Sequence, residues 1–496
     1  MIAAETPQTD LPDARVIAEV IARAGSFGYE QWWSRMTAAG YCAAPIKLLR
    51  SDRAGESSVL VRCKNRRAVV CPSCSDLYAG DTWHLVHAGL GGGHHIPATV
   101  AAHPAVFLTL TAPSYGPVHT THTSSGKGSG SGSGSGSEGE SGPCRPASGS
   151  GTCPHGVVRF CMVVHSETDS RLGQPICPQC YDYTGHALFT WNAPTLWARF
   201  TITLRRLVRR QLAVLGEEPG SVRVSFVKIV EMQRRGIPHF HAVIRLDAAP
   251  LPGENNEPHN PPTGLSADNL AALAQRAARL AHLEVPGTDG ELTRIRFGTQ
   301  IDTQPLTIPE EPRGTASGSG GRAAAVGMAR RVAGYLAKYV TKSVTDFGIA
   351  PRRFPPEAID SLSVSPHVAL LLHALAALSR PGGDTDTGGN GPQRWLHTLG
   401  YRGHITTKSR RYSTTMGALR AIRAQFQKLH TRVPSQEQRA GGGQSAERPE
   451  LPEWEYAAHG HRNLGERFLV VSAALRIRES RWAARQLIDT VEAESP

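Results

Sequence analysis

The chain has 496 residues, a formal net charge of +12 and a sequence pI near 9.5. This length exceeds what one hydrophobic core supports, so we expect two to four domains, and the basic excess favours a polyanionic partner. No stretch approaches the roughly 20 apolar residues of a membrane span, and the acidic N-terminal residues are unlike a signal peptide, so we expect a cytoplasmic protein without membrane contact.

The first part of the chain contains segments with a helical pattern and segments rich in cysteine. Residues 14–39 have helical periodicity and predict one or two helices, whereas residues 41–74 consist of short runs punctuated by cysteines. Residues 106–111, VFLTLT, alternate as a strand does. Residues 124–142 are almost pure Gly and Ser, which predicts a disordered insertion, and residues 143–183 form a second Cys-rich segment.

The second part predicts the remainder of a mixed domain. Residues 198–215 have the pattern of an amphipathic helix, and strands at 222–230 and 239–246 flank a turn at 234–236. Residues 323–344 are helical, and Gly-rich linkers interrupt a C-terminal region of mixed helices. We therefore expect an α+β fold with a central antiparallel sheet, Cys-rich zinc-binding segments and a basic helical C-terminal region.

A histidine pair marks the second of these strands. Strand alternation places His239 and His241 on one face of the sheet, where two imidazoles can share a metal ion. Glu231 ends the preceding strand, and a connecting loop of three or five residues would place its carboxylate opposite the histidines, whereas a two-residue loop would turn it away. Two histidines and a carboxylate with open positions suit Mg²⁺ or Mn²⁺ holding a phosphate oxygen.

A cluster of tyrosines and lysines follows in residues 335–342, YLAKYVTK. Residues four apart share a helix face, so Tyr335 and Tyr339 are neighbours, and Lys338 and Lys342 form an adjoining pair. A tyrosine can act as a covalent nucleophile, and beside a polarised phosphodiester it could displace the 3′ oxygen. Taken alone, the pattern is more typical of an amphipathic helix with packed tyrosines and solvated lysines.

The nine cysteines favour metal sites over disulfides in a reducing compartment. A CxxC knuckle lets two thiolates reach one Zn²⁺ ion. We expect two structural zinc sites, formed by Cys42, Cys63, Cys71 and Cys74, and by Cys153, Cys161, Cys177 and Cys180. Cys42 is the expected fourth ligand of the first set, Cys144 is left over, and His155 or His165 could replace a cysteine. Scattered buried thiols are the alternative.

A basic segment lies downstream at residues 402–415, where cations alternate with hydroxyls and an aromatic ring. Such groups contact phosphates and stack on bases. We expect DNA contacts from Arg402, Lys408, Arg410 and Arg411, although composition alone allows a solvated charge run equally well.

In their order along the chain, VFLTLT, EMQRRGIPHFHAV and YLAKYVTK resemble the three motifs of HUH-type rolling-circle replication initiators. The Y-x-x-x-Y-x-x-K form is similar to the A protein of small single-stranded DNA phages. The flanking text, including CPSCSDLYAGDTWHL, CPQCYDYTGHALFTWNAP, RFTITLRRL and GYRGHITTKSRRYSTTMGALR, resembles Rep proteins of actinobacterial plasmids and integrative conjugative elements. Together these pieces span about residues 40–425.

The resemblance implies an endonuclease that nicks one strand at a replication origin, presented as a single strand or hairpin. A 5′-phosphotyrosine would form, a free 3′ hydroxyl would prime the host polymerase, and the displaced strand would later be rejoined. The resemblance implies that His239, His241 and Glu231 are metal ligands. It also implies that Tyr335 and Tyr339 are the nucleophiles, and that Lys338 and Lys342 bind the phosphate. The chain has no G-x-x-x-x-G-K-[ST] motif, so we also expect a host helicase.

This reading predicts five successive segments: a helical segment, a first zinc segment, the HUH domain with its two insertions, a basic DNA-binding region, and a linker with a C-terminal helix. Their boundaries are 1–40, 41–100, 101–347 (with 124–142 disordered and 143–183 zinc-binding), 348–433 and 434–496. Two alternatives stay open: a related HUH transposase or relaxase, and a zinc-finger DNA-binding regulator without catalysis.

Overall fold

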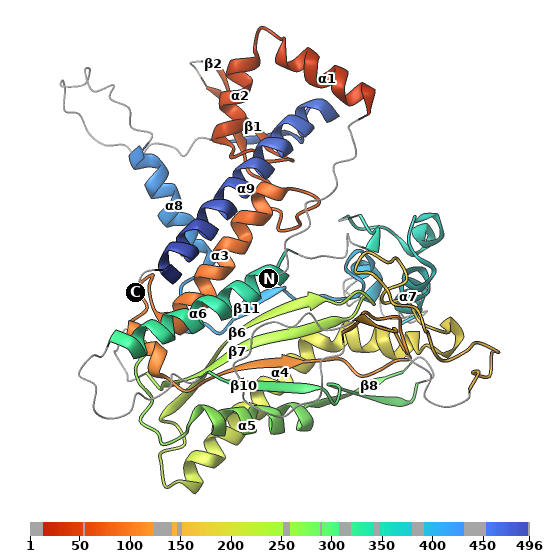
Figure 1. Ribbon diagram of the computed structural model, residues 1–496, viewed down its shortest axis with the longest axis vertical. Helices are drawn as coiled ribbons and strands as arrows, with labels where there is room; N and C mark the ends of the chain where they lie inside the picture. Colours follow the sequence, from red (N-terminus) through yellow and green to blue (C-terminus); the bar gives the residue numbers. More distant parts are fainter. Residues whose placement is uncertain are drawn as a thin grey trace. The chain divides into compact units, whose positions relative to one another are not determined.

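The computed structural model describes most of the chain: residues 13–52, 55–123, 141–145, 151–250, 258–287, 290–306, 319–341, 347–350, 352–378, 391–430 and 453–494. It forms two compact units. One, which we call the terminal unit, combines Met1–His84 with Thr415–Pro496, and the other, the central unit, is Leu85–Thr414 (Figure 1). This division differs from the five successive segments expected from the sequence, because the two ends of the chain pair with each other.

The terminal unit is built from both ends of the sequence around a three-stranded antiparallel sheet of order β12-β1-β2. Helix α1 packs along α9, and Arg23 on α1 forms a 3.2 Å ion pair with Glu466 on α9. The elements of the unit are α1 (Ala14–Ala24), α2 (Tyr29–Ala38), β1 (Ile46–Asp52), β2 (Gly55–Val61), α8 (Met416–His430), β12 (Glu455–His459) and α9 (Leu464–Glu494). Helix α3 (Pro72–Gly91) begins in this unit and ends in the central one.

The central unit contains a five-stranded antiparallel sheet of order β10-β3-β7-β6-β11. Helices α4 and α5 cover one face, and α6 lies against the other (Figure 1). The strands are β3 (Ala105–Leu110), β6 (Val222–Met232), β7 (Pro238–Ala248), β10 (Ile301–Pro305) and β11 (Thr406–Lys408). The helices are α4 (Tyr183–Val214), α5 (Ala267–Leu280) and α6 (Ser319–Tyr339). The expected mixed fold with a central antiparallel sheet is thus confirmed.

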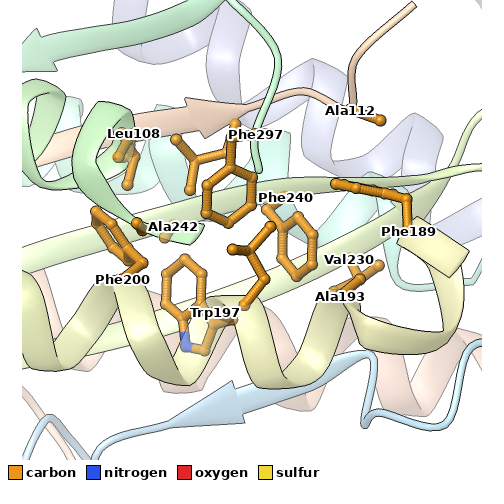
Figure 2. Packing of buried hydrophobic residues seen from close by; sticks show 14 of the residues in the cluster. Leu108, Ala112, Phe189, Ala193, Trp197, Phe200, Val230, Phe240, Ala242 and Phe297 are labelled. Carbon is orange, nitrogen blue, oxygen red and sulfur yellow. The ribbon is translucent and has the colours of Figure 1, made fainter. Parts of the chain in front are cut away.

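The hydrophobic core lies between the sheet and α4, as Figure 2 shows. Phe240 of β7 stacks on Trp197 of α4 with ring centroids 5.8 Å apart and an interplanar angle of 9°. Phe240, Ala242 and Ile244 all join this core, so strand alternation places His239 and His241 on the opposite face, toward α6. Burying a side chain as large as Phe240 contributes roughly 1.5–3 kcal/mol.

Several elements extend beyond their expected limits. Helix α4 begins well before residue 198, because Oδ1 of Asp182 accepts a 2.7 Å hydrogen bond from the backbone N–H of Gly185 and caps the helix. Strand β11, expected within a separate basic region, instead pairs with β6 at the sheet edge. The smaller elements are η1 (Ala98–Ala102), β4 (His122–Thr123), β5 (Ser141–Gly142), η2 (Pro178–Cys180), β8 (His282–Pro286), β9 (Leu292–Arg296), η4 (Pro356–Ser361), α7 (Pro366–Ala377) and η6 (Pro392–Thr398).

Within the part of the chain that the structure describes, no helix is both long and apolar enough to cross a bilayer. Residues 124–140 of the expected disordered insertion lie outside the described residues.

A buried ion pair lies on the α6 side of the sheet. The guanidinium of Arg245, which is fully buried, donates to both carboxylate oxygens of Asp247 over 2.6 and 3.1 Å. Asp247 also accepts from Ser225 over 2.5 Å and lies 2.9 Å from Nδ1 of His103. Burial acts to raise the pKa of Asp247, but its bonds to His103 and Arg245 outweigh burial and hold it below the usual range.

Replacing Asp247 by Asn is expected to destabilise the central unit by roughly 3 kcal/mol, since it leaves a buried guanidinium without its counter-charge. Urea unfolding of the full chain measures the effect. Asp302→Asn, at an exposed position of β10, is the matched control and should leave the free energy of unfolding within about 0.5 kcal/mol of wild type. Equal midpoints for the two variants would contradict the assigned role of Asp247.

Candidate active site and metal-binding clusters

The β6–β7 hairpin sets the position of Glu231. Five residues, 233–237, connect the two strands, and the register pairs Glu231 directly with His239 and Ile229 with His241. This is one of the two loop lengths that turn the carboxylate toward the histidines. Oε2 of Glu231 lies 3.5 Å from Nε2 of His241.

His241 is held by the neighbouring strand. Its Nδ1 lies 3.2 Å from Oγ1 of Thr109 on β3, and when that oxygen accepts a hydrogen bond from Nδ1–H, Nε2 is the unprotonated nitrogen. Among the described residues, Nε2 of His241 is one of the buried nitrogens that make no hydrogen bond. A buried imidazole nitrogen that makes no hydrogen bond and lies beside a carboxylate is a suitable ligand for a divalent cation.

His239 lies at the edge of the same site, its ring centroid 4.6 Å from that of His241. Burial and the neighbouring His241 lower the pKa of His239 to about 4, so the imidazole is neutral at neutral pH, as a metal ligand must be. Nδ1 of His239 lies 3.2 Å from the side-chain amide of Gln233. If that amide presents its oxygen to Nδ1–H, Nε2 of His239 becomes the nitrogen available to an ion.

Helix α6 places both tyrosines over the histidines. The ring of Tyr339 stacks on that of His241 with centroids 5.1 Å apart, and the ring of Tyr335 lies edge-on to His241 at 5.5 Å. The two phenol rings are 4.9 Å apart, and the ring of Phe107 on β3 lies edge-on to that of Tyr335 with centroids 5.7 Å apart. Burial, followed by a hydrogen bond to Tyr335, raises the pKa of Tyr339 above its usual range.

The lysines are described only in part. Lys338 lies in the last turn of α6 with an exposed side chain, and Lys342 lies outside the described residues. A cavity of about 530 Å³ opens beside Glu231. It is lined by the segment around Asp169, by Arg234 of the hairpin turn and by His367 of α7.

The donor atoms of the histidine pair and Glu231 are gathered less tightly than those of the cysteines. Among the described residues, three groups of Cys and His side chains have all their ligand atoms within 4.8 Å of one another, and the histidine pair with Glu231 is not one of them. The chemistry of that set, two imidazoles and a carboxylate, fits a divalent cation, although the three side chains would have to draw together around it.

The first cysteine cluster lies in the terminal unit and unites all four residues expected there. Sγ of Cys42 lies 3.8 Å from Sγ of Cys71 and 3.7 Å from Sγ of Cys74. These separations match the edge of about 3.8 Å of a tetrahedron of sulfurs around Zn²⁺ with bonds of about 2.3 Å. The backbone N–H of Cys63 donates to Sγ of Cys42 over 3.3 Å, which favours a thiolate. The cluster could therefore hold a metal ion.

The second expected set is divided between two clusters. Cys153, Cys177 and Cys180 are joined by His155, not by Cys161. Cys161 lies instead with His119, Cys144 and His165, so Cys144 is not left over. The expected grouping is thus corrected, because backbone pairing of Arg145 with Cys161 carries that thiol away from the other three. The sequence spacing could not reveal this pairing.

The basic segment contributes fewer free groups than its composition suggests. The guanidinium of Arg402 donates to the Trp191 carbonyl and to Oγ1 of Thr195 over 3.3 and 2.9 Å, and Nζ of Lys408 donates to a backbone carbonyl over 3.0 Å. The aromatic ring expected to stack on bases, Tyr412, is fully buried. Arg410 is exposed and Arg411 is partly buried.

Thr109, Phe107 and Gln233 also belong to the site, although no sequence pattern indicated them individually. The first two point toward α6 from VFLTLT, whose alternation already indicated a strand with one polar face. Gln233 belongs to the hairpin turn, whose conformation no spacing rule specified.

The comparisons with known proteins define the class: the chain is a replication initiator. A family model described as "Replication initiator protein, pSAM2" (RepSA) matches residues 28–475. The chain is 34% identical over 508 residues to a replication initiator protein of Streptomyces ambofaciens, and the match covers 96% of this chain and 97% of that relative. The chain therefore belongs to the RepSA family of replication initiators. No solved structure matches it.

Proposed function

We propose that this replication initiator nicks one DNA strand at a plasmid-type origin by tyrosine attack and later rejoins the displaced strand. The observation that carries the proposal is the placement of Tyr335 and Tyr339 against the ring of His241, with Glu231 beside it. The site then acts as an HUH-type nickase in the central unit, and the two tyrosines permit two successive transfers.

The chemistry balances without an external energy source. The phenol oxygen of one tyrosine attacks the scissile phosphorus and loses its proton, and the bond from phosphorus to the 3′ oxygen breaks. The 3′ oxygen takes up a proton and becomes the primer hydroxyl, while the 5′ phosphate stays on tyrosine. The phosphotyrosine conserves the energy of the broken diester, so a later attack by a 3′ hydroxyl rejoins the strand without ATP.

The chain's own residues divide these tasks. His239, His241 and Glu231 would hold Mg²⁺ or Mn²⁺, which polarises the scissile phosphate when bound. Lys338, and with it Lys342, would place a cation near the developing negative charge. The cysteine clusters would hold structural Zn²⁺. A free 3′ hydroxyl needs a host polymerase, and a host helicase would supply the exposed strand.

Incubation of the purified protein with Mn²⁺ and labelled single-stranded oligonucleotides tests the proposal. The oligonucleotides tile the non-coding DNA beside the gene for this chain. A protein–DNA adduct that survives denaturation is the expected result, and it should retain a label placed on the 3′ side of the nick and lose a label placed on the 5′ side. Mass spectrometry should map the adduct to the peptide containing residues 335–339. If no tile and no divalent metal yields an adduct, the chain acts as a DNA-binding regulator without catalysis.

A transposase or relaxase would share this chemistry but act on a different DNA. The match of nearly the whole chain to a replication initiator favours an origin over a transposon end or transfer origin. Adducts formed with a transposon end but with none of the origin tiles would favour the alternative.

The double substitution Arg410→Ala, Arg411→Ala is expected to weaken DNA binding and reduce its salt dependence. Each lost phosphate contact lowers the slope of log K against log salt by about 0.7 on single strands and 0.9 on duplex. Arg410 is exposed at the edge of the sheet and should carry most of the change. Fluorescence anisotropy with labelled origin DNA at several salt concentrations measures the slope, and an unchanged slope would remove this segment from the DNA interface. Arg15→Ala, in the terminal unit, is the control.

A further inference from the structure

The segment between β3 and α4 contains two clusters of metal-ligating side chains whose members alternate along the chain. One cluster, the His119 site, comprises His119, Cys144, Cys161 and His165. The other, the Cys153 site, comprises Cys153, His155, Cys177 and Cys180. In chain order the ligands form four successive pairs, and pairs one and three belong to the His119 site, whereas pairs two and four belong to the Cys153 site.

We propose that this segment is a cross-braced module that binds two Zn²⁺ ions, one in each site. Together with the cluster around Cys42, the chain would then hold three structural zinc ions and use all nine of its cysteines as ligands. The His119 site is the addition: sequence spacing left Cys144 without a role and grouped Cys161 with another set.

The donor atoms of the His119 site converge on one point. Nδ1 of His119 lies 3.1 Å from Nε2 of His165, and that nitrogen lies 3.4 Å from Sγ of Cys161. Sγ of Cys144 lies 3.9 Å from Nδ1 of His119. Tetrahedral Zn²⁺ with bonds of about 2.0 Å to nitrogen and 2.3 Å to sulfur requires ligand separations of about 3.3–3.8 Å. The observed distances, 3.1 to 3.9 Å, lie within or about 0.2 Å outside that range. Two thiols with two imidazoles are a common ligand set of structural zinc sites.

A second layer of contacts orients these ligands. Nδ1 of His165 donates to the Asp169 carboxylate over 2.7 Å, which leaves its Nε2 lone pair directed at the site. Arg171 in turn donates to both oxygens of Asp169, over 3.1 and 2.8 Å. The backbone N–H of Thr120 donates to Sγ of Cys144 over 3.2 Å, which favours the thiolate. A buried imidazole fixed by a carboxylate is the arrangement typical of a zinc-bound histidine.

Backbone pairing brings the ligands of each site together. Arg145 and Cys161 exchange hydrogen bonds of 2.8 and 2.9 Å, so Cys144 and Cys161 become neighbours. Residues 151–160 form a turn in which Thr152 is bridged to Val158, and this turn carries Cys153 and His155 of the other site. Closing the His119 site therefore shortens the loop that holds half of the Cys153 site, and the two ions should bind cooperatively.

The segment needs such ions because it has little core of its own. Across the residues 117–121, 142–145 and 151–180, the buried side chains are those of Cys144, Cys153, His165, Leu172, Pro175 and Cys177. Phe160 and Met162, by contrast, are exposed. Metal ligation couples the free energy of ion binding to folding, and two buried aliphatic side chains cannot replace that contribution.

The module also reaches the candidate active site. The α-carbon of Gly173, with a φ of +84°, faces the backbone of Arg234 in the β6–β7 turn so closely that an added Cβ would lie 2.5 Å from the Arg234 carbonyl carbon. Asp169, next to the His119 site, lines the cavity that contains Glu231. Ordering of the His119 site should therefore hold one wall of that cavity in place.

Zinc content and zinc-edge X-ray absorption of the full chain test the proposal. Three ions per chain with an average of three sulfurs and one nitrogen each are expected from the ligand sets. Two ions per chain, each with four sulfurs and no nitrogen, would overturn it. The wild-type measurement does not depend on the folding of any variant, and the same measurement on His241→Ala removes any contribution from zinc bound at the histidine pair.

Variants separate the two possible partners of Cys161. Cys144→Ser should remove one ion, or two if binding is cooperative, whereas a site made of four cysteines including Cys161 would leave the content unchanged. His119→Ala should act in the same way. His373→Ala is the matched control, because His373 is bonded to Asp360 on the surface and belongs to none of the three clusters. Unchanged zinc in Cys144→Ser would contradict the module.

Discussion

Replacing both Tyr335 and Tyr339 by phenylalanine is expected to lower covalent adduct formation with origin DNA by roughly a thousandfold or more. Removing a nucleophile leaves only positioning and electrostatic effects, which cannot form the phosphotyrosine bond. Phenylalanine keeps the ring contacts with His241 and Phe107, so the fold of the site should persist. The adduct is measured after denaturation, and DNA affinity is measured separately.

The single substitutions should have a different effect, because both rings contact His241 at similar distances of 5.5 and 5.1 Å. Either remaining tyrosine should still nick a single origin strand. A protein with one tyrosine should fail, however, when a second strand must be cleaved while the first stays attached. A two-step strand-transfer assay with two labelled oligonucleotides measures this. Tyr456→Phe, at an exposed position of β12, is the control.

Two results would contradict the assignment. An adduct of wild-type yield in the double variant would place the nucleophile elsewhere. Strand transfer at the wild-type rate in both single variants would mean that the two tyrosines do not act in succession at one site.

The sequence predicted those parts of the site that follow from local periodicity. Strand alternation placed His239 and His241 on one face, and helical spacing placed Tyr335 beside Tyr339; the structure has both arrangements. The position of Glu231 was conditional on the loop length, and the five-residue turn resolves it. These features involve residues that are close in sequence, and their relative positions follow from the period of two residues in a strand or of 3.6 residues in a helix.

Features that depend on long-range pairing could not be predicted. The backbone bridge between Arg145 and Cys161 moved one thiol from its expected set, and no spacing rule contains that bridge. The pairing of β12 with β1, about 400 residues apart, unites the two ends of the chain in one unit. The basic composition around Tyr412 suggested a ring that could stack on bases. The ring is instead buried and packs against Gly89, where an added Cβ would clash with it.

Replacing His241 by Ala is expected to reduce nicking by roughly a thousandfold, and His239→Ala should have a comparable effect, because each substitution removes one imidazole from a set of three ligands. DNA affinity should change little, since His241 is buried and His239 is partly buried. Nicking at the wild-type rate in His241→Ala, with DNA binding intact, would mean that the histidine pair is a packing feature of the sheet.

Thr109 provides a finer test of the same site, because it acts through His241 as a positioning residue. Its Oγ1 lies 3.2 Å from Nδ1 of His241, and loss of such a contact to a metal-ligating histidine costs about 10–100-fold in metal affinity or activity. Thr109→Val keeps the shape of the side chain and loses the acceptor, so nicking should need a higher Mn²⁺ concentration for half-maximal rate. Thr109→Ser keeps the acceptor and should restore the wild-type midpoint. A wild-type Mn²⁺ midpoint in Thr109→Val together with a shifted midpoint in Thr109→Ser would show that Thr109 only packs against the ring, because a purely steric role responds to the lost methyl group and not to the lost hydroxyl.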